Sequence, residues 1–477
     1  MPDTPVTTNT GNLALRTLES HDIEHLRALV DDPKRIIVGN AIHEDYSHDE
    51  LHTLVHAPEV LIEAVSTAEI SAIMRYASAK GIAVTARGQG TGLVGGAVSL
   101  HGGIMLSLQK MNKFLELDVE NMLLTVEPGV LLMEIAEYLA PTGLFYPPDP
   151  GEKSATIGGN ISTNAGGMRA VKYGVTRDYV RSLEVVLASG EVVEVGGKVA
   201  KNSSGYSIKD LMIGSEGTLG IITKATLKLI GQPKVTVSLL IPFPDLGAAI
   251  SAVPAILKVR QVPTAVEFMQ REVIEAASEY LGRPFPDNSA DAYLLVSCDG
   301  PTRRIVDESV DEIAQVALGH GAIDAFLADT PERQLSVWST RGTFLEAIKA
   351  STSMIDECDV VVPRNEVASF ITFSYELQAK HGLRLMSFGH AGDGNLHIYA
   401  LRDDLDEATW TTRVEAVFAA MYDRAHAIGG KVSGEHGIGF AKMRYLASSE
   451  QEPTIRLMQA IKRAFDPQGI LNPGKIV

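Results

Sequence analysis

The chain has 477 residues, which is too long for one ordinary hydrophobic core and predicts two or more domains. Its 59 acidic and 42 basic residues give a net charge of −17, which argues against nucleic acid or an anionic membrane surface as a main partner. Two isolated cysteines exclude an iron–sulfur cluster held by this chain alone and favour a reducing compartment.

Residues 1–50 are expected to form an N-terminal helical segment, because four apolar side chains share one helical face: Ile23, Leu26, Leu29 and Val30. The first 15 residues lack the basic start and apolar core of a secretory signal. No apolar run approaches the roughly 20 residues that cross a bilayer. A cytoplasmic protein without a membrane span is therefore expected.

Residues 51–231 are predicted to form the first large domain, which begins with a strand–helix–strand unit. Glu59–Val65 and Gly81–Arg87 have the composition of strands, and Ser66 with Glu69 matches a capping box at the start of the helix between them. The elements expected next are strands at 103–108, 114–118 and 123–127, a helix at 130–140, a long loop at 141–167, a hairpin turning at Ser189-Gly190 and a strand at 218–230.

Residues 232–425 are predicted to form a second domain of the α+β class. Strands such as Val235–Ile241 and Ala292–Cys298 alternate there with longer helical patterns, which favours an antiparallel sheet backed by helices. Residues 426–477 contain a glycine-rich loop and an amphipathic helix, and they are expected to return to the first domain and complete the active site.

The first glycine-rich loop lies at residues 87–96, where Gly90, Gly92 and Gly95 match the G-x-G-x-x-G fingerprint of NAD-binding Rossmann domains. A Rossmann loop opens a helix that receives the pyrophosphate, whereas this loop runs into a strand-like segment. A nest of backbone N–H groups that binds phosphate without a helix is therefore favoured, and a tight turn between strands is the alternative.

Two further glycine-rich stretches, at residues 147–167 and 214–223, carry small hydroxyl and amide side chains. Three such loops within one segment indicate a large cofactor with several polar sections. Residues 55–230 resemble the FAD domain of the vanillyl-alcohol oxidase/p-cresol methylhydroxylase (PCMH-type) superfamily. Residues 86–100 contain no histidine, so noncovalent FAD is expected. The resemblance implies FAD contacts at Gly88, Gly90, Thr91, Gly92, Asp149, Thr156, Gly159, Asn160, Thr163, Glu216, Gly220 and Ile222.

A second constellation combines histidines with a carboxylate. His390 and His397 flank the turn of an expected hairpin, and Glu435 precedes His436 in the glycine-rich loop. Two histidines and one carboxylate form a common ligand set for a divalent metal with open positions. The alternative is a polar hairpin and a glycine-rich loop whose histidines are only hydrogen-bonded.

These segments resemble the FAD-linked 2-hydroxyacid dehydrogenases, which include D-lactate dehydrogenases, the flavin subunit of glycolate oxidase and D-2-hydroxyglutarate dehydrogenases. The resemblance implies that His390, His397 and Glu435 hold zinc, iron or manganese and that His436 is the base. It also implies that Arg341 binds the substrate carboxylate; Asn395 is expected to orient the substrate or a metal ligand, and Lys349 and Arg364 are weaker candidates. Residues 356–359 are acidic where hydroxyglutarate enzymes carry a lysine, which argues against a dicarboxylate substrate.

The expected activity is the oxidation of a small D-2-hydroxy acid, D-lactate to pyruvate, by hydride transfer to FAD. Nearly the whole chain resembles the dehydrogenase subunit of lactate dehydrogenase/electron-transfer-flavoprotein complexes. An electron-transfer flavoprotein is therefore the expected electron acceptor, and a hetero-oligomer the expected assembly. The alternatives are a glycolate oxidase-type or D-2-hydroxyglutarate dehydrogenase-type subunit, a metal-dependent hydrolase and a non-catalytic flavin carrier.

Overall fold

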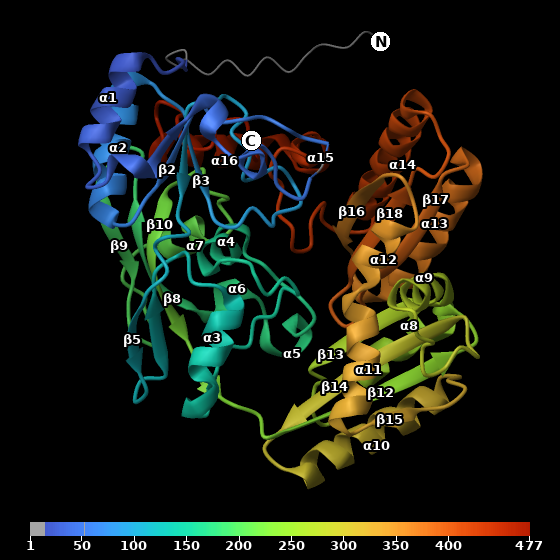
Figure 1. Cartoon of the computed structure of the whole chain (residues 1–477). Helices are drawn as coiled ribbons and strands as arrows, with labels where there is room; N and C mark the ends of the chain where they lie inside the picture. The colour runs from blue at the N-terminus through green and yellow to red at the C-terminus, as the bar shows by residue number, and fades with distance from the viewer. Residues whose placement is uncertain (1–14, 52) are drawn as a thin grey trace.

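The computed structural model describes residues 15–51 and 53–477, which form two lobes that lie side by side (Figure 1). One lobe contains the N-terminal half of the chain together with the last helix, and the other contains the segment between them. Among the described residues, no helix is both long and apolar enough to cross a membrane.

The first lobe contains two main sheets that pack against separate hydrophobic clusters. One sheet has the order β1-β2-β4-β3, with β4 parallel to both β2 and β3, and its strands are β1 (Ile36–Val38), β2 (Val60–Glu63), β3 (Val84–Arg87) and β4 (Ile104–Ser107). The other is antiparallel, with the order β5-β6-β10-β8-β9, and its strands are β5 (Phe114–Asp118), β6 (Leu123–Val126), β8 (Val180–Val186), β9 (Val192–Gly196) and β10 (Ile221–Lys228). A two-stranded sheet joins β7 (Leu144–Phe145) to β11 (Ile230–Gly231).

The helices of this lobe are short, apart from α2. They are α1 (Ser20–Ala28), α2 (Thr67–Lys80), α3 (Leu132–Leu139), α4 (Ile157–Thr163), α5 (Ala170–Tyr173), α6 (Thr176–Tyr179) and α7 (Ile208–Met212). The predicted capping box of α2 is only half formed. The Ser66 hydroxyl accepts from the Glu69 N–H at 3.3 Å, but the Glu69 carboxylate accepts from the Val65 N–H and pairs with Arg35. A buried guanidinium is a stronger partner for that carboxylate than a second backbone N–H.

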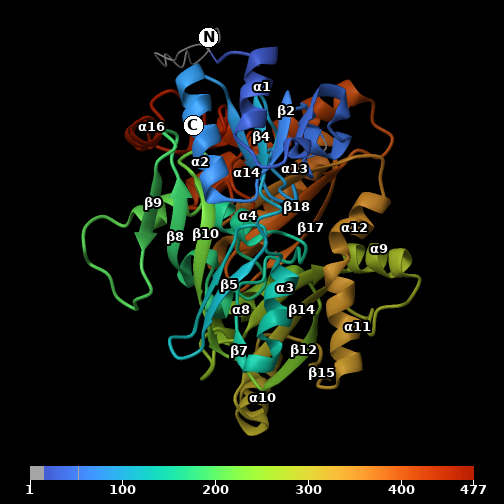
Figure 2. The ribbon, with the colours of Figure 1, turned by 60° about the vertical axis from the view of Figure 1, so that its left-hand side comes forward.

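The last helix, α16 (Glu452–Phe465), returns to the first lobe, where Figure 2 shows it beside β8, β9 and β10. The helix before it, α15 (Met443–Ser449), instead packs through Tyr445 and Leu446 into the hydrophobic cluster of the second lobe. Ile461 and Phe465 of α16 pack against the apolar cluster under that sheet. Beyond α16, Leu471 forms a parallel bridge with Val84 of β3. The predicted return of the C-terminal segment is therefore confirmed.

The second lobe is a seven-stranded antiparallel sheet with helices on both faces, as an α+β pattern predicts. In the order β15-β12-β14-β13-β17-β18-β16, its strands are β15 (Phe326–Ala328), β12 (Val235–Phe243), β14 (Ala292–Gly300), β13 (Ala265–Gln270), β17 (Arg384–His390), β18 (Asn395–Leu401) and β16 (Ile355–Val361). One face packs on α8 (Leu246–Ile256), α10 (Arg303–Gly319), α13 (Val367–His381) and α14 (Glu407–Ala427). The opposite face packs on α9 (Arg271–Leu281), α11 (Pro331–Gly342) and α12 (Phe344–Ala350).

Two sequence expectations about secondary structure are corrected. In the predicted helical segment 1–50, only α1 is an α-helix among the described residues; 1–14 lie outside them, and the β-branched run at 36–38 pairs with β2 as a strand. The predicted loop 141–167 contains α4. The Thr156 side chain caps this helix by accepting from the Gly159 N–H, which explains a helix in a glycine-rich stretch.

Candidate active site

One face of the seven-stranded sheet gathers the polar side chains of the site. Cross-strand partners lie on the same face of a sheet, and so do alternate residues of a strand. His390 pairs with Glu267 of β13 and with Asn395 of β18, and His397 pairs with Asp359 of β16. The hairpin between β17 and β18 therefore forms as predicted, and its two histidines are diagonal neighbours on one face.

Three donor atoms converge where this face meets the loop after α14. The Nε2 atoms of His390 and His397 lie 3.4 Å apart, and the Glu435 Oε1 lies 3.4 Å from the first and 3.3 Å from the second. The other Glu435 oxygen, Oε2, is buried and has no hydrogen-bond partner among the described residues. An unpaired buried carboxylate oxygen beside two imidazole nitrogens is what a metal-binding set with open positions requires.

The carboxylates and histidines of this cluster shift one another's pKa values. Burial alone lowers the pKa of His397, but Glu357 and Glu435 outweigh it and raise that pKa to about 9. Burial likewise opposes the raised pKa of His390, which Glu267 and Glu435 produce. For Glu435, burial raises the pKa, and the two histidines lower it below its ordinary range. The site thus stabilises positive charge between its carboxylates, and a divalent cation would replace the histidine protons.

Each of these two histidines is backed by a second carboxylate. The Glu267 carboxylate lies 2.7 Å from His390 Nδ1, and Glu357 Oε1 lies 3.1 Å from His397 Nδ1. Histidines that bind a metal through one nitrogen commonly donate the other N–H to a carboxylate, which fixes the tautomer and the ring. Both rings are therefore oriented with Nε2 toward Glu435.

Asp359 organises the glycine-rich loop that carries Glu435 and His436. Its carboxylate accepts from the Ser433 hydroxyl at 2.8 Å and from the backbone N–H groups of Gly434 and His436, both at 3.2 Å. Lys442 Nζ, also buried, lies 3.1 Å from the same oxygen. Burial would raise the pKa of Asp359, but Lys442 and the nearby histidines hold it well below its ordinary value. The loop is thereby fixed to the sheet by a charged anchor.

A glycine-lined cleft in the first lobe ends at this loop, since Glu435 and His436 both contribute to its wall. Of the twelve predicted FAD-contacting residues, all but Asp149 line the cleft. The Asp149 carboxylate is instead buried and paired with Lys153 and Arg169. Two of the glycine-rich stretches meet closely here, because a Cβ at Gly88 would collide with the Thr156 hydroxyl.

The first glycine-rich loop does not open a helix. Residues 88–103 run without helix into β4, and Gly90 and Gly95 have φ of +79° and +73°. Left-handed backbone at these glycines is compatible with the predicted phosphate-binding nest, and the missing helix argues against a Rossmann turn. The G-x-G-x-x-G match therefore lacks the context of a Rossmann NAD site.

The remaining predicted residues lie outside the three-donor cluster. The buried Arg341 guanidinium donates through Nε and Nη2 to Glu267, at 3.0 and 2.6 Å, and lies 4.5 Å from the centre of the Phe388 ring. The Asn395 side chain donates to Asp359 at 2.7 Å, so it supports the loop anchor. Lys349 pairs with Glu346 and Glu50 and lines a neighbouring cavity of about 440 Å³, while Arg364 begins a 3₁₀ turn.

Sequence reasoning missed Glu267 and the roles of Glu357 and Asp359. The available signal was local: Glu267 is a single carboxylate in the otherwise apolar run 265–269, and Glu357 and Asp359 alternate along one strand. An isolated acid in a buried strand needs a partner, because an unpaired buried charge is costly. The sequence did not indicate which residues pair with these three acids.

Comparison with known proteins identifies the family of the chain. Residues 58–206 match the family described as FAD binding domain, and residues 232–476 match the family described as FAD linked oxidases, C-terminal domain. The chain is 49% identical to a D-lactate dehydrogenase of Anaerostipes hadrus, over 93% of this chain and 95% of that one. It is 38% identical to glycolate oxidase subunit GlcD of Bacillus subtilis, over 95% and 96%. The fold is that of p-cresol methylhydroxylase, with a TM-score of 0.78 and 19% identity over 96% of both chains.

Proposed function

This chain belongs to the family of FAD-linked oxidases, and we propose that within this family it oxidises a small D-2-hydroxy acid, with D-lactate as the first substrate to test. The observation that carries the proposal is the cluster of His390, His397 and Glu435 beside His436, at the end of the glycine-lined cleft. The full-length similarity to a D-lactate dehydrogenase supports the choice of substrate.

The cleft fits FAD, bound noncovalently. Its wall is mostly backbone and small side chains, two glycine-rich stretches approach within contact distance at Gly88 and Thr156, and Gly90 and Gly95 adopt the left-handed backbone of an anion nest. Bound FAD would supply the acceptor for the hydride from C2 of the substrate. We propose that the eleven predicted residues that line the cleft hold it, and that Asp149 supports the loop through Lys153 and Arg169.

The three-donor cluster fits a divalent metal, with zinc, iron and manganese as the candidates. His390, His397 and Glu435 would hold it, and Glu267 and Glu357 would orient the two histidines from behind. A metal bound here would lower the pKa of the substrate 2-hydroxyl, as it does for water. The unpaired Oε2 of Glu435 supports a metal more than it supports a purely hydrogen-bonded cluster.

Three further residues are proposed to remove the substrate proton, bind the substrate carboxylate and support the loop. His436 is the proposed base, because its Nε2 lies 3.7 Å from Glu435 Oε1 and its ring lines the cleft. Arg341 is the proposed partner of the substrate carboxylate, through the edge of the guanidinium that does not face Glu267. Asn395 acts indirectly, by holding the Asp359 anchor of the loop.

Anaerobic titration with D-lactate tests this proposal. The purified enzyme is expected to be yellow. D-lactate is expected to bleach the visible absorbance band of the oxidised flavin, at about 450 nm. L-lactate is the stereochemical control, and glycolate and D-2-hydroxyglutarate separate the related subunit types. A colourless enzyme would favour the hydrolase alternative, and a flavin that none of these acids reduces would favour a flavin carrier.

We further propose that electrons leave through an electron-transfer flavoprotein, in a hetero-oligomer in the cytoplasm. The loop that resembled a nicotinamide site lacks its helix, and both cysteines are free and buried. The test is steady-state oxidation of D-lactate with NAD alone and then with NAD and the cognate electron-transfer flavoprotein. Equal rates of NAD reduction in the two assays would reject the electron-transfer flavoprotein as acceptor. They would also revive the interpretation of Gly90, Gly92 and Gly95 as an NAD site.

A further inference from the structure

We propose that Glu357 is the positioning residue of the active site and that it holds His397 and His436 in the same tautomer, with both Nε2 atoms directed toward Glu435. This inference deepens the proposed function and rests on it for the roles of the two histidines. It concerns a residue of β16 that stands 40 residues from His397 along the chain.

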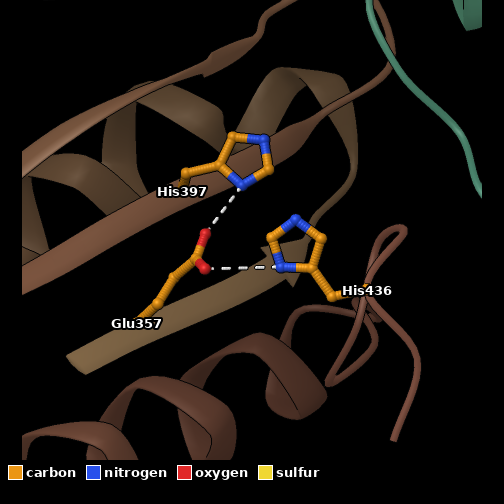
Figure 3. A group of neighbouring side chains, drawn as sticks. All are labelled: Glu357, His397 and His436. Atoms are coloured by element: carbon orange, nitrogen blue, oxygen red, sulfur yellow. Dashed lines mark hydrogen bonds and ion pairs between the residues drawn. The ribbon is translucent and has the colours of Figure 1, made fainter. Parts of the chain in front are cut away.

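The contacts of Glu357 reach both rings at once. Its Oε1 lies 3.1 Å from His397 Nδ1, and its Oε2 lies 3.4 Å from His436 Nδ1. Figure 3 shows the carboxylate beside the two rings, one oxygen directed to each, with the second nitrogen of each ring turned away from it. The rings stack with centres 5.2 Å apart and planes 23° apart. One carboxylate thus orients a proposed metal ligand and the proposed base together.

The tautomer follows from the chemistry of the groups. An ionised carboxylate only accepts hydrogen bonds, so we infer that each Nδ1 facing it carries the proton. At His436 the contact is an ion pair, and Asp359 Oδ2, a second acceptor, lies 3.8 Å from the same Nδ1. A neutral imidazole then has its lone pair on Nε2. His397 Nε2 lies 3.3 Å and His436 Nε2 lies 3.7 Å from the same Glu435 oxygen. With Nδ1 carrying the proton, Nε2 is the nitrogen left to bind the proposed metal at His397 and to accept the substrate proton at His436.

The same three residues, Glu357, His397 and His436, have the spacing of a second metal site. Two observations favour hydrogen bonding instead. The Tyr399 hydroxyl also donates to Glu357 Oε1, at 2.8 Å, so this oxygen already accepts twice. His397 points its Nε2 into the first donor cluster, where His390 lies 3.4 Å away. If His397 binds a metal there through Nε2, its Nδ1 keeps the proton and donates it to Glu357.

Replacement by glutamine tests the inference without changing the size of the side chain. A glutamine offers one carbonyl and one NH2, so it accepts from one ring only and presents a donor to the other. Glu357→Gln is expected to move the proton of His436 from Nδ1 to Nε2. The measurement is long-range ¹H–¹⁵N NMR of FAD-loaded enzyme labelled with ¹⁵N-histidine, with His436 assigned by its loss in His436→Gln. The control is Tyr399→Phe, which removes a hydrogen bond to Glu357 without touching either histidine.

The kinetic readout is the rate of anaerobic flavin reduction at saturating D-lactate. Glu357→Gln is expected to lower this rate by about 10–100-fold, the usual effect of losing such a partner, with KM changed much less and FAD retained. Tyr399→Phe is expected to stay within about threefold, since Glu357 keeps its contacts with both histidines in this variant and loses one hydrogen bond. An unchanged His436 tautomer, or a Glu357→Gln rate equal to the wild-type rate, would overturn the inference. So would two metal ions per wild-type chain with one lost in Glu357→Gln, because Glu357 would then be a ligand.

Two outcomes remain informative if the kinetic assay fails. If D-lactate does not reduce the wild-type flavin, the proposed substrate is wrong, and the His436 tautomer still decides the role of Glu357. If Glu357→Gln does not fold, the wild-type spectrum decides alone, since a proton on His436 Nε2 contradicts the inference and one on Nδ1 supports it.

Discussion

The Glu216 carboxylate accepts a hydrogen bond of 2.7 Å from the backbone N–H of Gly439, a residue 223 positions away. It accepts a second, also of 2.7 Å, from the N–H of Ile438. Glu216 lines the cleft of the first lobe and has φ of +51°, so the third glycine-rich stretch directly holds the loop that carries His436. This contact fixes the loop of the C-terminal segment against the first lobe.

Glu216→Ala is therefore expected to lower the rate of flavin reduction by about tenfold, because small displacements of a base are costly, and to lower the melting temperature. Stopped-flow reduction and thermal unfolding of the FAD-loaded enzyme measure the two effects. Glu152→Ala, at the same cleft, is the matched control. A Glu216→Ala enzyme with wild-type rate and stability would show that the loop does not depend on this contact.

Gly88→Ala is expected to lose FAD. The added methyl group would collide with the Thr156 hydroxyl and separate the two glycine-rich stretches. The measurement is the flavin-to-protein absorbance ratio of the purified variant. Gly319→Ala is the control, because a Cβ there meets open space. In the wild-type protein, acid or heat should release one FAD per chain without proteolysis; flavin that stays on the denatured chain would contradict noncovalent binding.

Replacing either predicted histidine ligand should remove the metal and the activity together while FAD stays bound. His390→Ala and His397→Ala each leave two of the three donors, too few for a stable site. Elemental analysis of wild-type and variant enzymes measures the metal, and absorbance measures FAD. His320→Ala, an exposed histidine at the end of α10, is the control. Active wild-type enzyme that contains no metal would reject the assignment.

His436→Ala should lower turnover by about 10²–10⁴-fold, the usual contribution of a positioned base. Its metal content should change little, because the Nε2 of His436 lies farther from Glu435 Oε1, at 3.7 Å, than that of His397, at 3.3 Å. Anaerobic reduction by D-lactate is the assay. Near-normal reduction in this variant would assign the proton transfer to another group.

Lys475 should make stability rise with pH in the alkaline range. Burial lowers its pKa to about 8 from the ordinary 10.5, against the attraction of Asp49 and Glu216. Between these two values the unfolded chain binds more protons than the folded chain, so folding gains stability as pH increases. Lys475→Met lacks this contribution. Melting temperatures of both enzymes at pH values of about 7.5 and 9.5 should therefore diverge in favour of the wild type at the higher pH; parallel curves would contradict the shifted pKa.

Several strands and the hairpin turns followed from local sequence. Residues 114–118 form β5 as predicted, and the turn at Ser189-Gly190 joins β8 to β9, because alternation and turn residues act over a few positions. The ligand candidates were also visible, since His390 and His397 flank one hairpin and Glu435 and His436 are neighbours in sequence. These features depend on residues close together in the chain.

Tertiary structure decided which charged groups face the site. Glu267 reaches His390 across 123 positions, and Asp359 reaches the loop at His436 across 77. It also decided that Arg341 is paired with Glu267 and that Asp149 lies outside the cleft wall. Sequence alone determined the reactive residue types and many of the elements, because backbone propensity and side-chain periodicity are local. The partners of each charge depend on strand order and on how the lobes pack, which bring together residues that no local pattern relates.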